Sequence, residues 1–181
     1  MEKTKTAFDL DGVIINKPPL IPKKLMERLF KGKNHNGLHY RFPKSKLEIL
    51  IRKISHYYLF RPPIRKNIKF IKELAKNDKY ELYIVSGRYS FLEKETENWL
   101  KKRGIKDLFK KVYINLNDEQ PHLFKEKKLK EINPISFVDD DFLLADYLTD
   151  KIKTTKIFCL SKNNNFSSKA INVLAVSSVL K

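Results

Sequence analysis

Short apolar runs bounded by polar turn residues recur along the chain and predict buried β-strands. The six runs are residues 6–10, 80–87, 111–115, 135–140, 155–160 and 171–176. Between them, residues 65–77, 90–104 and 123–132 carry helical patterns. Strands that alternate with helices of this length form βαβ units, in which helices cover both faces of a parallel sheet. The pattern therefore predicts an α/β fold.

Residues 17–63 interrupt this alternation. Proline pairs stand near both ends of the segment, and such pairs are typical of boundaries. Helical patterns occupy residues 22–30 and 44–60 inside it. We predict a small helical cap at 17–63, inserted after the first strand of a core domain that comprises 1–16 and 64–181.

The second cap pattern has apolar side chains at helical spacing: Leu47, Leu50, Ile51, Ile54, Tyr57 and Tyr58. We predict that the aromatic residues of "SHYYLF" belong to the cap's own core. A platform on which nucleic-acid bases stack is the alternative.

The charge of the chain is concentrated in the same region. The formal net charge is +17, from 38 basic and 21 acidic residues. Residues 17–66 hold 14 of the basic residues and only two of the acidic ones. Such a field attracts anionic substrates and polyanions, so nucleic acid is a candidate partner through the basic cap, although a basic surface also serves solubility.

The sequence carries neither the pattern of a membrane protein nor that of a secreted protein. No apolar stretch approaches the length of a membrane span, and the N-terminus lacks the apolar segment of a secretory signal. We therefore expect a cytoplasmic protein. The single cysteine, Cys159, lies in a strand-like run, which predicts a buried apolar role and excludes a disulfide within the chain and a zinc site of several thiolates.

Polar residues gather where the predicted strands end. Asp9 and Asp11 end the first apolar run, Ser86 to Arg88 end the second, and Asp139 to Asp141 end the fourth. Ligands of parallel α/β sheets bind beyond the carboxyl ends of the strands. Carboxylates that meet there repel one another unless a cation lies among them, and hard oxygen ligands favour Mg²⁺.

The run of motifs "FDLDGVI", "IVSGR", a lysine-bearing helix and "FVDDD" resembles the phosphohydrolase branch of the haloacid dehalogenase (HAD) superfamily. The resemblance covers residues 5 to 146 except the cap, and implies the HAD-like Rossmannoid fold. It implies that Asp9 is the nucleophile that takes the phosphoryl group and that Asp11 is the acid and base. Asp11 would then need a pKa above its usual range.

The resemblance also implies roles for residues after the later strands. Ser86 would donate its hydroxyl to the phosphoryl group, with Gly12, Gly87 and Arg88 also at the substrate. Lys125 is our choice for the lysine that offsets charge in the transition state, because it lies one turn before Leu129. Lys127 and Lys128 are the alternatives.

The metal would be Mg²⁺, bound by Asp9, Asp11, Asp139 and Asp140. Asp140 would take the metal and Asp139 would support it. The triple aspartate leaves this register open by one residue, and a shift to Asp141 and Asp146 is the less favoured alternative. One of the three aspartates is expected to cap the following helix. His35, His39, His56 and His122 lack metal-binding spacing, so we assign them to surface or core positions.

The favoured hypothesis is a Mg²⁺-dependent phosphomonoesterase that forms an aspartyl-phosphate. The basic cap indicates a highly anionic phosphorylated substrate: a nucleotide, a nucleic-acid end or a polyphosphorylated small molecule. The motifs are also similar to those of 5'-nucleotidases and of the phosphatase domains of polynucleotide kinase phosphatases. The alternative hypothesis is a non-catalytic nucleic-acid-binding protein on the same scaffold. The sequence leaves the oligomeric state open.

Overall fold

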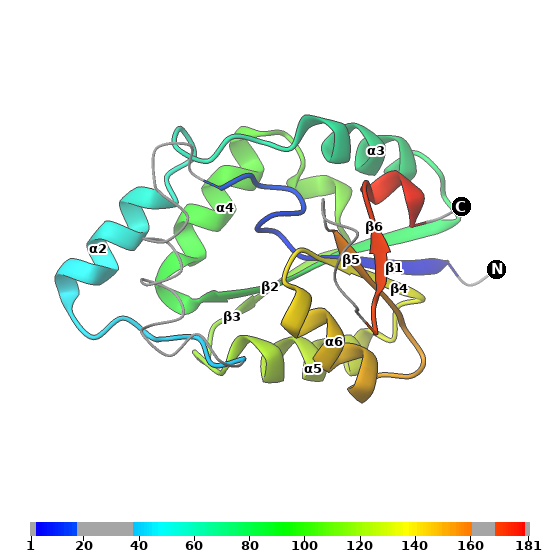
Figure 1. The fold of residues 1–181 in the computed structure, drawn as a ribbon. Helices are drawn as coiled ribbons and strands as arrows, with labels where there is room; N and C mark the ends of the chain where they lie inside the picture. The colour runs from blue at the N-terminus through cyan, green and yellow to red at the C-terminus, as the bar shows by residue number, and fades with distance from the viewer. Residues whose placement is uncertain (1–2, 18–37, 161–168, 180–181) are drawn as a thin grey trace.

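A six-stranded parallel sheet forms the centre of the computed structural model, which describes residues 3–17, 38–160 and 169–179 (Figure 1). The strands are β1 (Thr4–Phe8), β2 (Tyr80–Tyr89), β3 (Lys111–Asn115), β4 (Ser136–Asp139), β5 (Lys156–Leu160) and β6 (Ile171–Val173). Their order in the sheet is β3-β2-β1-β4-β5-β6, and every neighbouring pair is parallel. The predicted α/β fold is confirmed.

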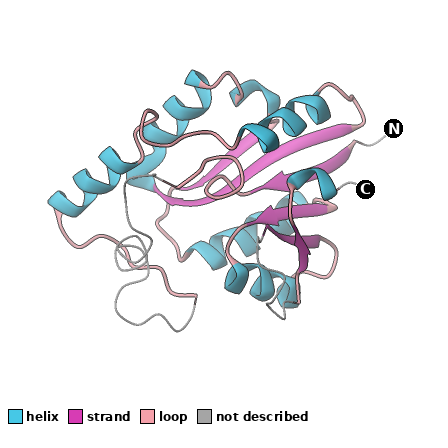
Figure 2. Cartoon of the chain, turned by 45° about the horizontal axis from the view of Figure 1, so that its top comes forward, coloured by secondary structure: helices cyan, strands magenta, loops and turns pink. Residues whose placement is uncertain are grey.

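Helices cover both faces of the sheet. α3 (Arg65–Ala75) and α4 (Glu93–Lys102) lie on one face, and α5 (Pro121–Ile132) and α6 (Phe142–Lys151) lie on the other (Figures 1 and 2). Each layer has its own apolar core, one around Trp99 and Phe8 and the other around Phe137 and Leu129. Cys159 is buried in β5, as predicted.

The strand order places a switch point at β1. The chain moves outward from β1 to β2 and β3, then crosses to β4 on the other side of β1 and moves outward again. Loops after β1, β2 and β4 therefore leave the same edge of the sheet in diverging directions. A crevice at this edge is where open α/β sheets bind ligands.

The two ends of the predicted cap segment lie side by side. The Asn16 amide donates to the Pro62 carbonyl at 2.8 Å, and the Ile64 amide donates to the Ile14 carbonyl at 2.9 Å. The chain thus leaves the core and returns to it at adjacent points. The cap boundaries themselves stay a prediction.

Helix α2 (Lys46–Ser55) is the described helix of the predicted cap, and it is shorter than the predicted 44–60. Ser45 begins it, with its side-chain oxygen accepting from the Glu48 amide. The predicted helix 22–30 lies outside the described residues.

The prediction that the aromatic residues of "SHYYLF" form a cap core is wrong for the described residues. Tyr57 and Phe60 are each 47% exposed. The apolar side chains of α2 that share the pattern, Leu47, Leu50, Ile51 and Ile54, are 46–67% exposed. Helical spacing indicates which side chains share a face, but it does not show that another element covers that face. Tyr58 alone packs, in part, against the core of the main domain.

Within the described ranges, no helix combines the length and the apolar character needed to cross a bilayer.

Candidate active site

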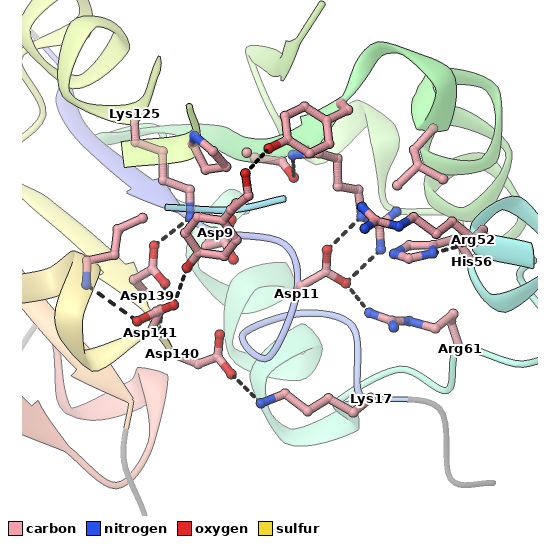
Figure 3. Close-up of a pocket in the computed structure, with 18 of the residues that line it drawn as sticks. Asp9, Asp11, Lys17, Arg52, His56, Arg61, Lys125, Asp139, Asp140 and Asp141 are labelled. Atoms are coloured by element: carbon pink, nitrogen blue, oxygen red, sulfur yellow. Dashed lines mark hydrogen bonds and ion pairs between the residues drawn. The ribbon is translucent and has the colours of Figure 1, made fainter. Parts of the chain in front are cut away.

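A cavity of about 410 Å³ opens at the switch point between the carboxyl ends of the strands and α2. Its wall includes Asp9 and Asp11 after β1, Ser86 to Arg88 in β2, and Asp139 to Asp141 at the end of β4. Figure 3 shows that the labelled carboxylates lie mostly on one side and the arginines on the other. The strand-end residues predicted from the sequence thus meet in one place.

The turn after β1 determines how the first aspartates are presented. The Ile14 and Ile15 amides both donate to the Leu10 carbonyl, so the chain reverses at once behind Asp9. Gly12 has φ +75°, in the left-handed region that favours glycine. A side chain on Gly12 would also collide with the Asp140 carboxylate. Gly12 therefore allows β1 and β4 to bring their acidic groups together.

Lys125 joins the aspartates of the two central strands. Its Nζ lies 2.9 Å from Asp9 Oδ1 and 2.7 Å from Asp139 Oδ2, and all three side chains are buried. Desolvation would lower the pKa of Lys125, but the two carboxylates outweigh it and raise the pKa, so the lysine stays charged. Lys127 and Lys128 instead pair with Glu119 and Glu131. The structure thus brings Lys125, and neither alternative lysine, into the cavity wall.

Asp9, Asp139 and Asp140, here called the carboxylate cluster, could hold a metal ion. Each offers one oxygen, and the three oxygens lie within 4.8 Å of one another. Burial raises the pKa of Asp9 well above its usual range, with Lys125 acting in the opposite direction. Burial likewise raises the pKa of Asp140 to about 6. Buried carboxylates whose pKa values are raised in this way would be stabilised in their ionised form by a cation. Hard divalent cations prefer oxygen ligands, so the donor set fits Mg²⁺.

The three aspartates after β4 have different surroundings. Asp139 accepts from Lys125 on one oxygen and from the Asp141 amide on the other, at 2.9 Å. Asp140 contacts the exposed Lys17 at 3.2 Å, and Asp141 caps α6 through the Leu143 and Leu144 amides. Both oxygens of Asp139 are thus engaged by the protein, which suits a supporting role, whereas Asp140 is the more accessible ligand.

Ser86 and Gly87 form the wall beside Asp9. Ser86 is buried, and its Oγ accepts from the Arg88 amide at 3.4 Å. A Cβ on Gly87 would lie 2.7 Å from Pro121 Cβ. Pro121 is the first residue of α5, so the missing side chain of Gly87 allows the start of that helix to pack against β2. The same packing places Lys125, one turn later, beside Asp9.

Asp11 lies in a different environment from Asp9. Arg88 donates to both of its oxygens at 2.7 Å, and Arg61 also pairs with it. Desolvation would raise the pKa of Asp11, but the guanidiniums of Arg88 and Arg61 outweigh it and hold the pKa far below its usual range. The predicted upward shift is therefore wrong for this arrangement, because the sequence gives no sign that two arginines face Asp11. Its side chain also lies outside the carboxylate cluster.

Three residues that the motifs did not identify line the same end of the cavity: Arg52, His56 and Arg61. Burial and the neighbouring Arg88 lower the pKa of His56 to about 3, so it is neutral. Its Nδ1 lies 2.7 Å from the Arg52 carbonyl, which can only accept, so Nδ1 carries the proton. The predicted surface or core position of His56 is correct in that the side chain is buried, but the side chain lies in the cavity wall. Only the position of Arg61 in "RPP", where the chain returns to the core, could have identified that arginine.

Comparison with known proteins gives structural matches. No protein-family model and no curated protein sequence matches the chain. A HAD-like hydrolase from Streptococcus pneumoniae matches with 13% identity and a TM-score of 0.62 over 94% of this chain and 93% of that one. The HAD-type protein YfnB of Bacillus subtilis, in a magnesium-bound form, matches with 12% identity and a TM-score of 0.61 over 98% and 97%.

An L-2-haloacid dehalogenase from Xanthobacter autotrophicus matches with 11% identity and a TM-score of 0.58, over 91% of this chain and 80% of that one. The TM-scores show that these structures share the sheet and helix arrangement that the motifs predicted, and at such low identities the similarity extends to the fold alone. The chain has the fold of the HAD superfamily.

Proposed function

We propose that the chain is a Mg²⁺-dependent phosphomonoesterase that works through a phosphoryl group carried on Asp9. The observation that carries the proposal is the arrangement around Lys125, which lies between Asp9 and Asp139 in a cavity that Asp140 also lines. A nucleophile, a fixed positive charge and metal-binding carboxylates are the groups that phosphoryl transfer requires. The substrate we propose is a small, highly anionic phosphate ester.

Asp9 is the nucleophile in this mechanism. Its carboxylate attacks phosphorus, the bond from phosphorus to the alcohol oxygen breaks, and that oxygen takes a proton from Asp11. Water then attacks the phosphorus of the phosphorylated Asp9 while Asp11 accepts the proton, which releases phosphate. Lys125 and the Ser86 hydroxyl offset the charge that develops on the phosphoryl oxygens.

Asp9 and Asp140 would bind the Mg²⁺, and Asp139, whose oxygens accept from Lys125 and the Asp141 amide, would support the site. When bound, the ion supplies positive charge that keeps Asp9 ionised and neutralises the approaching phosphate. Because burial and the neighbouring carboxylates of Asp139 and Asp11 raise the pKa of Asp9, this positive charge favours the ionised form that attacks.

Asp11 is ionised while it pairs with Arg61 and Arg88. This form suits the second step, in which a base takes a proton from water. The first step needs a proton on Asp11, and the carboxylate must then separate from its two arginines. The release of a leaving group that is stable as an anion depends less on protonation by Asp11 than the release of a simple alcohol does.

A substrate panel tests the proposal. It comprises phosphorylated metabolites, nucleotides, oligonucleotides with 3'- or 5'-phosphates and 2-haloacids, each assayed with and without Mg²⁺. We expect phosphate release that requires Mg²⁺. Release of halide without phosphate release would make the chain a dehalogenase, and binding of oligonucleotides without any turnover would favour the non-catalytic alternative.

A further inference from the structure

The guanidinium cluster, defined as Arg52, Arg61 and Arg88, lies at the Asp11 end of the cavity. Arg61 and Arg88 pair with Asp11, but no step of the proposed chemistry places an arginine of this cluster on the phosphoryl group that Asp9 takes. All three arginines are buried, with Arg52 and Arg61 each 2% exposed, and all three line the cavity. Figure 3 shows Arg52 and Arg61 beside Asp11 and away from Lys125. Burying a guanidinium costs free energy of desolvation unless a negative charge lies beside it.

Among the described residues, the arginines at this end of the cavity outnumber the carboxylates that pair with them. Asp11 pairs with Arg61 and Arg88, and Glu48 pairs with Arg52 at 3.1 Å. Glu48 also pairs with a further cavity residue, Arg41, at 2.7 Å. Within the described part of the chain, these four guanidiniums thus form ion pairs with two carboxylates, and Asp140 adds a more distant negative charge that acts on Arg61. The Nε of Arg61 is buried and has no hydrogen-bond partner among the described residues.

The arginines are held in place by other parts of the protein. The Trp99 indole donates to the Arg61 carbonyl at 2.8 Å, and Arg88 Nη1 donates to Thr96 Oγ1 at 3.0 Å. Both partners belong to α4. Arg52 donates to the Arg41 carbonyl at 3.1 Å. The Trp99 contact fixes the backbone at Arg61, and the other two contacts fix the side chains of Arg88 and Arg52. Side chains that are fixed in this way lose little conformational freedom when they bind a ligand.

We propose that the guanidinium cluster binds a second phosphate group of the substrate, so that the enzyme acts on bisphosphorylated small molecules. The inference rests on the proposed function, because it assigns the first phosphate to Asp9. Both clusters line one cavity of about 410 Å³, a volume typical of sites for small ligands, so one molecule can reach both. A planar guanidinium donates two parallel hydrogen bonds to phosphate oxygens, and the charge of a phosphate dianion is opposite to that of the cluster.

A homologous series of linear alkanediol bisphosphates, with the matched monophosphates of the same diols, tests this proposal. For wild-type enzyme, we expect kcat/KM for the bisphosphate to exceed that for the monophosphate by about 10- to 100-fold at one chain length, as for hydrogen bonds to charged groups. A ratio near one at every length overturns the proposal.

Substitutions in α2 test whether the preference for the bisphosphate depends on Arg52. Arg52→Gln should lower the bisphosphate preference about tenfold or more, and Arg52→Lys should restore part of it. Lys53→Gln is the matched control, because Lys53 is the next residue of the same helix but does not line the cavity, and its preference should equal that of wild type. An equal loss in Lys53→Gln would assign the effect to general basic charge and overturn the proposal. If Arg52→Gln does not fold, the wild-type ratio decides.

Two further experiments distinguish this inference from the proposed function on which it rests and from nucleic-acid binding. If no phosphate ester is hydrolysed, the proposed function fails, and calorimetric binding of the same bisphosphates and monophosphates then decides the inference on its own: preferential binding supports it and equal binding overturns it. Affinity for a 5'-phosphorylated oligonucleotide that keeps rising with strand length would instead indicate an extended nucleic-acid surface, and would also overturn it.

Discussion

The two ends of the cavity differ in the charges that surround their buried aspartates. At the carboxylate cluster, aspartates from β1 and β4 crowd around Lys125, and the pKa values of Asp9 and Asp140 rise. At the guanidinium cluster, arginines crowd around Asp11, and the pKa of that carboxylate falls. Among the described residues, carboxylates predominate at one end and guanidiniums at the other.

The difference shows how two aspartates of one motif acquire separate properties. Asp9 and Asp11 are two residues apart, yet one faces a lysine and acidic neighbours while the other faces two arginines. Environments that push the pKa values of neighbouring groups apart are typical of sites that need different protonation roles. The carboxylate end attracts a cation, and the guanidinium end attracts an anion.

Replacing Asp9 should have the largest effect. Asp9→Asn removes the nucleophile, so we expect phosphatase activity to fall by at least about 10⁴-fold, as for other catalytic nucleophiles. The amide is nearly the same size, and circular dichroism and the melting temperature should show a folded protein. Activity within tenfold of wild type would exclude covalent catalysis by this residue.

Replacing Lys125 should rank second. Lys125→Met leaves Asp9 and Asp139 buried without their shared cation, so we expect kcat to fall about 100- to 1000-fold and the free energy of unfolding at neutral pH to fall by about 3–5 kcal/mol. Steady-state kinetics and urea denaturation measure the two effects. Lys127→Met is the control, since Lys127 makes an exposed pair with Glu119, and it should change neither quantity appreciably.

Ser86→Ala should have a milder effect. It removes one hydroxyl donor from the transition state, which lowers kcat by about 10- to 1000-fold. Because Ser86 donates to the transferring group rather than reacting with it, the pH profile of kcat/KM should keep its shape. A change of profile without a change of maximum rate would assign Ser86 to the support of a titrating group instead.

The smallest effect concerns His56 and the pH dependence of stability. Its pKa is about 3 in the folded protein against an ordinary value of 6.5, so the unfolded chain binds the proton more tightly between these values. Its contribution to stability is complete above about pH 6.5, and falls by up to about 1.4 kcal/mol for each pH unit below that value. His56→Asn should flatten the dependence between pH 6.5 and 4.5. An unchanged slope would mean that His56 is not held neutral.

The carboxylate end could be predicted from the sequence because its aspartates lie at or just after the carboxyl ends of β1 and β4. Parallel strands end at one edge, so Asp9, Ser86 and Asp139 had to meet once the strands were recognised. Lys125 was identified only through the family resemblance, since nothing in its helix distinguishes it from Lys127 or Lys128.

Of the guanidinium cluster, the sequence identified Arg88 through "IVSGR", but it identified neither Arg52 nor Arg61. Arg52 and Arg61 belong to the predicted cap, where they are two of many basic residues, and no motif distinguishes buried arginines from exposed ones. Their position depends on how the inserted segment packs against α4, through contacts such as that of Trp99 with the Arg61 carbonyl. The predicted pKa of Asp11 was wrong for the same reason, because its direction depends on these long-range neighbours.

Trapping of the phosphoryl group tests the central claim most directly. Wild-type enzyme is mixed with its best substrate from the panel and Mg²⁺, quenched in acid during turnover, digested and examined by mass spectrometry. The account predicts one phosphoryl group on the peptide that contains Asp9, removable by hydroxylamine and missing from the Asp9→Asn variant. Turnover with the phosphoryl group on another residue, or with no phosphorylated peptide at any quench time, would contradict it.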